Sequence, residues 1–301
     1  MATESPLFTF AFVTDLHFDR QHDPATPLVK GLNAGIAHPR PDFVVFNADT
    51  IDGHPDLAEM AWQNRTVKSI LDGLEMPYYT TCHSHDVSLE KETTPDNTYR
   101  RAFGGEAYDF IREFPGGFAG IFMSGCYVDD LGNYRDLKDG DPVSAAWLRK
   151  ALDGLKGRKV LFFYHFPVFI PRKPVDAELR RQIRPEMEAH YFSMKKDNPE
   201  LVRSIISAHG GVAAHYAGHC HVNSLNVHDG TYYVTTSALR YKPCEYLYVR
   251  VFQDRIEHRL IRGYDPGEQP WFWGPLVDED HLTPEAYHGG NPDERDFVIA
   301  L

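Results

Sequence analysis

Asp and His residues follow five apolar runs of this sequence, and they are the side chains whose types and spacing could carry chemistry. The segments are Asp15-Leu16-His17, Ala48-Asp49, His83-Ser84-His85-Asp86, His165 and His219-Cys220-His221. Open α/β sheets assemble their ligand crevices at the carboxyl ends of strands, so we expect these side chains to meet there. Carboxylate oxygen and imidazole nitrogen are good ligands for first-row divalent metals. The pattern therefore predicts a metal centre built on strand ends.

Each segment taken alone has an ordinary structural explanation. Asp49 fits a solvated turn, His165 fits a buried histidine with a hydrogen-bond partner, and His219 and His221 fit an ordinary strand. Packing alone does not explain why all five segments follow an apolar run. The combination favours one shared site over unrelated polar residues.

The elements that must position these residues alternate between strand-like and helical patterns. Short β-rich runs are predicted at residues 8–13, 42–46, 77–81, 120–123 and 160–164, with helices over 56–72 and from Pro142 and Pro199. Later β-rich runs after residue 221 predict antiparallel closing strands. Residues 171–195 combine prolines with partial helical patterning, which predicts a kinked helical excursion at one rim of the cleft. The fold class is layered α/β.

The chain divides into one large domain and a tail. Residues 1–262 contain the strand and helix patterns, whereas residues 263–301 are rich in Pro, Gly and acidic groups. This tail also carries Trp271, Trp273 and a final run over 296–301. We therefore expect it to pack on the domain rather than to form a free linker.

Composition limits the classes of partner. The 301 residues include 43 acidic and 31 basic side chains, and the net charge of -12 disfavours a nucleic-acid polymer. Small phosphorylated substrates stay compatible, because bound cations invert the potential in one cleft. Four cysteines without a CxxC pair favour reduced thiols in the cytoplasm. No apolar run is long enough to span a bilayer, so no membrane segment is expected. The oligomeric state is not indicated.

The ordered series of site residues resembles the signature of the calcineurin-like metallophosphoesterases. That series, Asp15-x-His17, Asp49, His85-Asp86, His165 and His219-x-His221, lies within residues 8–262. The segment around Trp147 and the strand before His165 also resemble the cyclic-nucleotide phosphodiesterase-like branch. The resemblance implies a four-layer α/β/β/α sandwich, in which two mixed sheets are flanked by helices and carry a two-metal site at their edge.

The same resemblance implies roles for individual residues. It gives two sets of metal ligands bridged by Asp49, namely Asp15, His17 and His221 for the first ion and His165 and His219 for the second. His85 corresponds to the catalytic histidine that assists the leaving group, with Asp86 as its orienting partner. Two divalent or trivalent ions, Mn, Fe or Zn, would clamp a phosphoryl group and supply a metal-bound hydroxide as nucleophile.

One segment departs from the family pattern. The family's Gly-Asn-His-Asp is replaced here by His83-Ser84-His85-Asp86, so the second metal loses its usual asparagine ligand. Ser84 can ligate through its hydroxyl or through water, and neighbouring His83 is the alternative ligand. Because adjacent residues point in different directions, Ser84 is slightly preferred. A third alternative is a second metal position that is partly empty.

These features predict a metal-dependent phosphate ester hydrolase. The segment around Trp147 slightly favours a phosphodiester over a phosphomonoester as substrate. The rival interpretation is a non-catalytic metal-binding scaffold that docks other proteins, which the missing asparagine keeps open. His85 weighs against that rival, because a docking protein has no need of a leaving-group acid.

Overall fold

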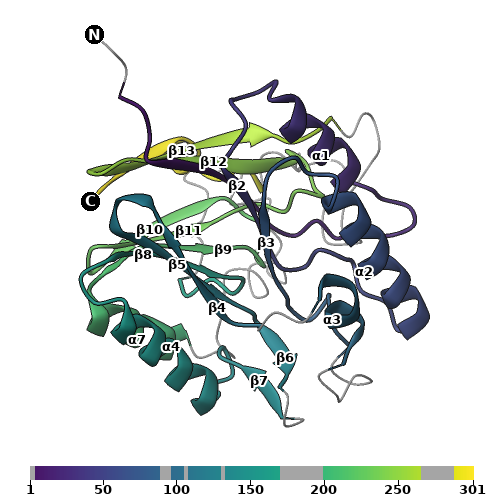
Figure 1. Ribbon diagram of the computed structural model, residues 1–301, viewed down its shortest axis with the longest axis horizontal. Coiled ribbons are helices and arrows are strands. Elements are labelled where there is room, and N and C mark those ends of the chain that lie inside the picture. Colours follow the sequence, from purple (N-terminus) through teal and green to yellow (C-terminus); the bar gives the residue numbers. More distant parts are fainter. Residues whose placement is uncertain (1–3, 89–95, 105–107, 130–132, 170–198, 266–287) are drawn as a thin grey trace, which may run out of the picture.

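Two six-stranded sheets pack face to face in the computed structural model, and helices cover both outer faces (Figure 1). The structure describes residues 4–88, 96–104, 108–129, 133–169, 199–265 and 288–301. The predicted four-layer α/β/β/α sandwich is confirmed. Within these ranges, no helix has the length and apolar character needed to cross a membrane.

The first sheet has the strand order β14-β13-β12-β1-β2-β3. Its strands are β1 (Phe8–Val13), β2 (Phe43–Asn47), β3 (Tyr78–Thr81), β12 (Glu245–Val251), β13 (Arg255–Arg262) and β14 (Phe297–Ala300). β1, β2 and β3 run parallel, whereas β12, β13 and β14 extend the sheet by antiparallel pairing. Helices α1 (Ala25–Ala34) and α2 (Leu57–Leu71) pack on its outer face, and α3 (Thr98–Phe103) lies beside α2.

The second sheet has the order β10-β11-β9-β8-β5-β4. Its strands are β4 (Phe110–Phe114), β5 (Phe118–Met123), β8 (Lys159–Tyr164), β9 (Val212–Ala217), β10 (Ser224–His228) and β11 (Thr231–Thr235). Helices α4 (Pro142–Gly154) and α7 (Pro199–His209) cover its outer face. A separate hairpin joins β6 (Cys126–Val128) to β7 (Tyr134–Asp136).

Alternating side chains explain how one strand serves two layers. Phe8, Phe10 and Phe12 of β1 enter the core between the sheets, whereas Ala11 and Val13 face the helices. This is the period of two expected of a strand that is buried on both faces. The core between the sheets is therefore rich in Phe side chains, and it packs against the strands that carry the site residues.

Aspartate side chains cap the first turns of α2 and α4. The Asp56 carboxylate accepts a hydrogen bond from the backbone N–H of Ala58, and Asp141 accepts one from Ser144. The helices predicted over 56–72 and from residues 142 and 199 are confirmed. The strands predicted after residue 221 are also present.

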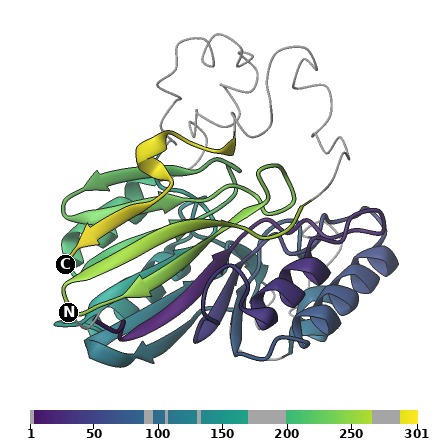
Figure 2. The same cartoon turned by 90° about the horizontal axis from the view of Figure 1, so that it is seen from above.

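The tail contributes the edge strand of the first sheet. β14 pairs antiparallel with β13, and both views of the ribbon place it there (Figure 2). Trp271, Trp273 and the helical excursion predicted over 171–195 lie outside the described residues. The domain boundary after residue 262 stays a prediction.

Candidate metal centre

Parallel strands from both sheets bring their carboxyl ends to one edge of the sandwich. β1, β2 and β3 are parallel neighbours in the first sheet, and β8 and β9 are parallel neighbours in the second. The predicted site residues follow these strands directly: Asp15 and His17 after β1, Asp49 after β2, His85 after β3, His165 after β8, and His219 and His221 after β9. The structure gathers all of them except His85 into two clusters, and it places His85 in a third group with His17 and Asp52.

Asp15, His17 and His221 form the first cluster. Asp15 Oδ1 lies 3.1 Å from His221 Nε2 and 3.5 Å from His17 Nε2, and the two Nε2 atoms are 3.2 Å apart. All three side chains are buried. Three potential ligand atoms therefore point at one small volume.

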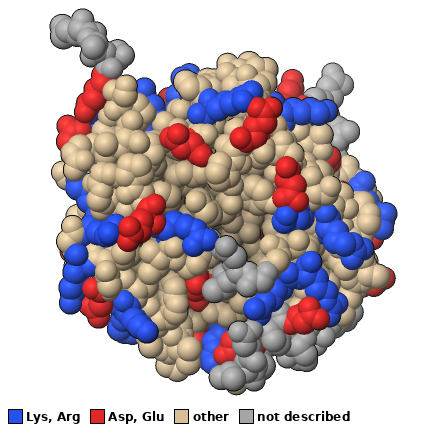
Figure 3. Space-filling model, in the orientation of Figure 1, with Lys and Arg blue, Asp and Glu red and all other residues tan. Residues whose placement is uncertain are grey.

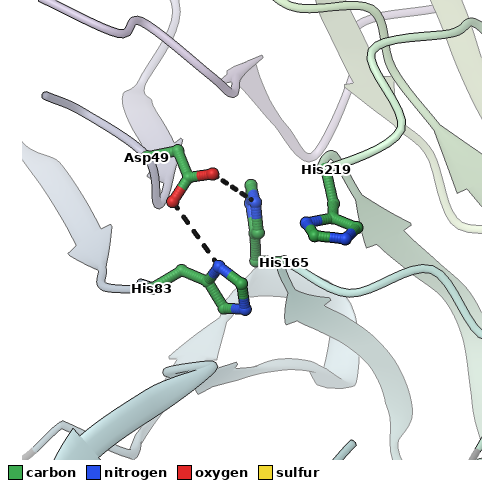
Figure 4. A group of neighbouring side chains, drawn as sticks. All are labelled: Asp49, His83, His165 and His219. Atoms are coloured by element: carbon green, nitrogen blue, oxygen red, sulfur yellow. Dashed lines mark hydrogen bonds and ion pairs between the residues drawn. The ribbon is translucent and has the colours of Figure 1, made fainter. Parts of the chain in front are cut away.

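Asp49, His83, His165 and His219 form the second cluster, shown in Figure 4. Asp49 Oδ2 lies 3.1 Å from His165 Nε2, and Asp49 Oδ1 lies 3.6 Å from His83 Nδ1. One ligand atom from each of the four residues lies within 4.8 Å of the others. Asp15 Oδ1 is also 3.6 Å from His165 Nε2, so this carboxylate stands between the two clusters.

The spacing within the clusters fits metal coordination. Bonds of ~2.0–2.2 Å place neighbouring ligand atoms about 3–3.5 Å apart in octahedral or tetrahedral geometry. The distances between Asp15, His17 and His221 lie between 3.1 and 3.5 Å. Asp49 Oδ1 and His83 Nε2 are buried without a hydrogen-bond partner, as expected of atoms in a site made for a cation. The residues can hold two metal ions.

Comparisons with known proteins agree with this geometry. No protein-family model matches the chain. Over 209 residues, 67% of the chain, it is 26% identical to the serine/threonine-protein phosphatase CPPED1 of Danio rerio, and the match covers 60% of that relative's length. A crystal structure of a dimetal phosphatase from Danio rerio has a TM-score of 0.63 at 16% identity, covering 87% of this chain and 98% of that one. The chain is thus similar in sequence to a phosphatase and shares the fold of a dimetal phosphatase, which agrees with the predicted resemblance to calcineurin-like metallophosphoesterases.

A second solved structure shares the fold. It is described as GAP50, the anchor in the inner membrane complex of Plasmodium, and has a TM-score of 0.52 at 14% identity, covering 90% of this chain and 89% of that one. Neither this match nor the others tests the phosphodiesterase-like branch, which stays a prediction. The fold shared with these structures accounts for the positions of the two clusters, and the local backbone accounts for their geometry.

Several of the candidate ligands have a left-handed backbone conformation. Among the described residues other than glycine, eight have positive φ. Five of these are predicted metal ligands: Asp15, His17, Asp49, His219 and His221. A left-handed backbone costs about 1–2 kcal/mol for such residues, and strain of this kind concentrates at functional sites. Ala48, directly before Asp49, also has positive φ, at 62°.

Hydrogen bonds to the backbone orient the clusters. His165 Nδ1 lies 2.7 Å from the carbonyl oxygen of Asn47, to which it donates, so its Nε2 faces Asp49. The His219 N–H donates to Asp15 Oδ2 at 3.1 Å. Gly218 permits this approach, since a Cβ there would lie 2.4 Å from Asp15 Oδ2.

The buried charges of the two clusters are strongly coupled. Burial raises the pKa of Asp15, but His165 and His221 outweigh it and hold that pKa well below its usual range. Burial lowers the pKa of His17, yet the carboxylates of Asp15 and Asp52 raise it to about 10. The carboxylates are therefore anionic and attract cations. The nearby carboxylates raise the pKa of His17 and His165, so these two histidines must lose protons before a metal binds, and acid opposes metal binding.

His85 lies beside the first cluster but is oriented differently from our expectation. Its Nδ1 lies 2.6 Å from the carbonyl oxygen of Asp52, and its ring is 4.8 Å from the ring of His17. The predicted orienting role of Asp86 is wrong. The Asp86 carboxylate instead accepts hydrogen bonds from the backbone N–H groups of Asp49 and His83 and from Thr50. Asp86 holds two loops together and does not turn the imidazole of His85.

Ser84 differs from its predicted position. The side chain is exposed, and its hydroxyl lies 3.1 Å from His83 Nδ1. His83, by contrast, is buried within the second cluster. The geometry thus favours His83 over Ser84, against the preference drawn from the sequence.

Asp52 is a functional candidate that the sequence analysis missed. Its Oδ1 lies 3.5 Å from His17 Nδ1 and 2.7 Å from Arg240 Nη1. Arg240 is buried and also donates to the carbonyl oxygen of His17, at 2.7 Å. A carboxylate behind a ligating histidine fixes its tautomer. The signal was the position of Asp52, three residues after Asp49 on the same loop.

Proposed function

We propose that this protein hydrolyses phosphate esters at a centre of two metal ions. The observation that carries the proposal is the convergence of two clusters of carboxylates and imidazoles beside His85. Bound metal ions would neutralise phosphoryl charge and lower the pKa of a water molecule. Asp15, His17 and His221 would hold one ion, and Asp49, His165 and His219 the other. Asp15 and Asp49 are both candidates to link the ions.

His85 would assist the leaving group. Because a backbone carbonyl only accepts hydrogen bonds, His85 Nδ1 carries the proton that faces Asp52. Its Nε2 is left to exchange a proton with a substrate. To protonate a leaving oxygen, the ring must be in its cationic form, with both nitrogens protonated.

The substrate class that we favour is a phosphomonoester. The relatives with the same fold are named as phosphatases. The diester preference drawn from the sequence rests on the segment around Trp147, and that side chain packs on the core beneath α4. The chain matches less than two thirds of the length of its curated relative, so the relative's substrate is not transferred.

Charge and thiols bear on the partner and the compartment. The net charge of -12 disfavours a nucleic-acid polymer. Lys and Arg are interspersed with Asp and Glu over the described part of the face in Figure 3, where they form no broad basic surface. All four cysteines are buried thiols outside any disulfide, as is usual for proteins of the cytoplasm. A small phosphorylated molecule fits these features best.

A docking scaffold is the second candidate function. The observation that favours it is that GAP50, which has the same fold, is described as an anchor. Such a role requires neither His85 nor paired metal clusters. Measured hydrolysis therefore discriminates between the two functions.

The test combines a substrate panel with one variant. Purified protein is assayed on a monoester, p-nitrophenyl phosphate, and on a diester, bis(p-nitrophenyl) phosphate, with added Mn, Zn or Fe. We expect His85→Ala to lower turnover about 10²–10⁴-fold while the metal content stays unchanged. His228→Ala is the matched control, because His228 is exposed at the end of β10 and its Nε2 lies 3.2 Å from Asp229 Oδ2.

Two results would contradict the proposal. Absence of hydrolysis with every metal and ester would favour the docking scaffold. Full activity of His85→Ala on both esters would remove that histidine from the reaction.

A further inference from the structure

We propose that His83 replaces the family's asparagine ligand and makes the second cluster a nitrogen-rich site that prefers Zn²⁺ to Mn²⁺. The inference rests on the proposed metal centre and concerns one position of it. His83 is only 2% exposed, and its Nδ1 lies 3.6 Å from Asp49 Oδ1. Its ring centroid is 4.7 Å from that of His165 and 5.4 Å from that of His219. These distances place the imidazole of His83 among the other ligand candidates, as Figure 4 shows.

The turn from Cys82 to Asp86 fixes this orientation. The Asp86 carboxylate accepts from the His83 N–H at 2.9 Å, and the Asp86 N–H donates to the His83 carbonyl at 2.9 Å. Residue 83 is thereby held by both of its backbone polar groups. Ser84 is exposed, and its hydroxyl lies 3.1 Å from His83 Nδ1, so it contacts the imidazole from the solvent side of the buried cluster.

Gly125 makes room for the imidazole. A Cβ at residue 125 would lie 2.0 Å from His83 Cδ2 and 3.1 Å from its Nε2. The Gly125 N–H donates to the carbonyl oxygen of Cys82 at 2.8 Å, which keeps the backbone beside the ring. The histidine at residue 83 thus requires a residue without a side chain at 125. An asparagine, being smaller, would need less of this space.

Donor chemistry then sets the metal preference. With His83, the second cluster offers three imidazoles and one carboxylate, whereas the first offers two imidazoles and one carboxylate. Imidazole nitrogen suits Zn²⁺, whereas oxygen donors suit Mn²⁺. Replacing an asparagine oxygen by an imidazole nitrogen shifts the metal selectivity of the second site in favour of Zn²⁺. The two sites should therefore differ in selectivity.

The experiment measures bound metal and does not depend on activity. Metal-free protein is titrated with Zn²⁺ and, separately, with Mn²⁺ against a competing chelator, and bound ions are counted by mass spectrometry. We expect the wild type to bind two Zn²⁺. His83→Ala should lower the affinity for one of these ions more than about 100-fold, because loss of even a residue that only orients a ligand lowers metal affinity about 10–100-fold. Ser84→Ala should change the affinity less than about tenfold. His83→Asn should raise the affinity for Mn²⁺ relative to that for Zn²⁺.

A second pair of variants protects the test against misfolding. Gly125→Ala should displace the ring of His83 and weaken the same ion. In a His83→Asn background, the added methyl group should have a smaller effect, which a double-mutant cycle reveals as coupling. Additive effects would contradict the predicted contact.

The outcomes separate this inference from the proposed function. If the wild type binds two ions and His83→Ala keeps both at full affinity, His83 is not a ligand. If Ser84→Ala alone releases an ion, Ser84 holds the position. A wild type that binds no metal would overturn both the inference and the proposed function.

Discussion

The two clusters of the metal centre are built from similar residues but are supported in different ways. Behind the first, His17 faces Asp52, and Asp52 is paired with buried Arg240. In the second cluster, the backbone carbonyl of Asn47 orients His165. The turn that is hydrogen-bonded to Asp86, beside Gly125, orients His83. One half of the site is thus held by ion pairs and the other by the backbone. Changes in charge should therefore affect the first cluster, and changes in shape the second.

Replacing Asp86 should have the largest effect on stability, because its carboxylate supports the backbone of residues in the second cluster. Its carboxylate accepts hydrogen bonds from the backbone of Asp49, Thr50 and His83. Asp86→Ala leaves these buried donors unpaired, at about 1–3 kcal/mol each. We expect the free energy of unfolding of metal-free protein, measured in urea, to fall by at least about 3 kcal/mol.

Asp86→Asn provides the control for this prediction. It keeps one acceptor oxygen and should be destabilised less than Asp86→Ala. Wild-type stability in the alanine variant would show that the two loops are held by other contacts.

Asp52 distinguishes the two clusters, because it contacts a candidate ligand of the first cluster, His17. Asp52→Asn removes the charge behind His17 and should weaken one of the two bound ions about 10–100-fold in the chelator titration. Asp19→Asn is the matched control, since Asp19 also contacts Arg240, at 3.1 Å, but has no described contact with the side chain of His17. Equal weakening of both ions by Asp52→Asn would show that the clusters share their support.

A core histidine outside both clusters gives an effect on stability that is small at pH 7 and grows only in acid. His258 accepts a hydrogen bond from the Tyr216 hydroxyl at 2.8 Å, and burial lowers the pKa of His258 to about 3. Between pH 6.5 and pH 3 the unfolded chain binds a proton at this residue that the native state does not, so acid destabilises the fold. His258→Gln should remove up to about 1.4 kcal/mol per pH unit of this dependence.

The measurement is urea denaturation from pH 7 to pH 4 in the presence of a chelator. The stability difference between wild type and His258→Gln should change with pH, to the disadvantage of the wild type in acid. A difference that stays constant over this range would contradict the assigned pKa shift.

The sequence predicted those parts of the molecule that follow a period or a cap. The apolar run of β1 and the helical patterns of α2 and α4 each depend on local residues, and the structure places these elements where the patterns indicated. Helix α1 was not predicted. Its segment contains Pro27 and Gly31, which obscure a helical pattern whose formation depends on packing of Leu28 and Leu32.

Within the site, residue types were predictable and orientations were not. Strand ends identified the segments that converge, because parallel strands share an edge. Whether His83 or Ser84 turns inward depends on the turn held by Asp86 and on the space beside Gly125, 42 residues away from His83 in sequence. The partner of His85 is a backbone carbonyl, which no residue pattern identifies. Long-range contacts decide such details.

The most direct test of the two-metal account is anomalous diffraction from crystals of the protein grown with Zn²⁺. The account predicts two peaks about 3.5–4 Å apart. One peak should lie among Asp15, His17 and His221, and the other among Asp49, His83, His165 and His219. A single peak, or peaks only at the protein surface, would contradict it.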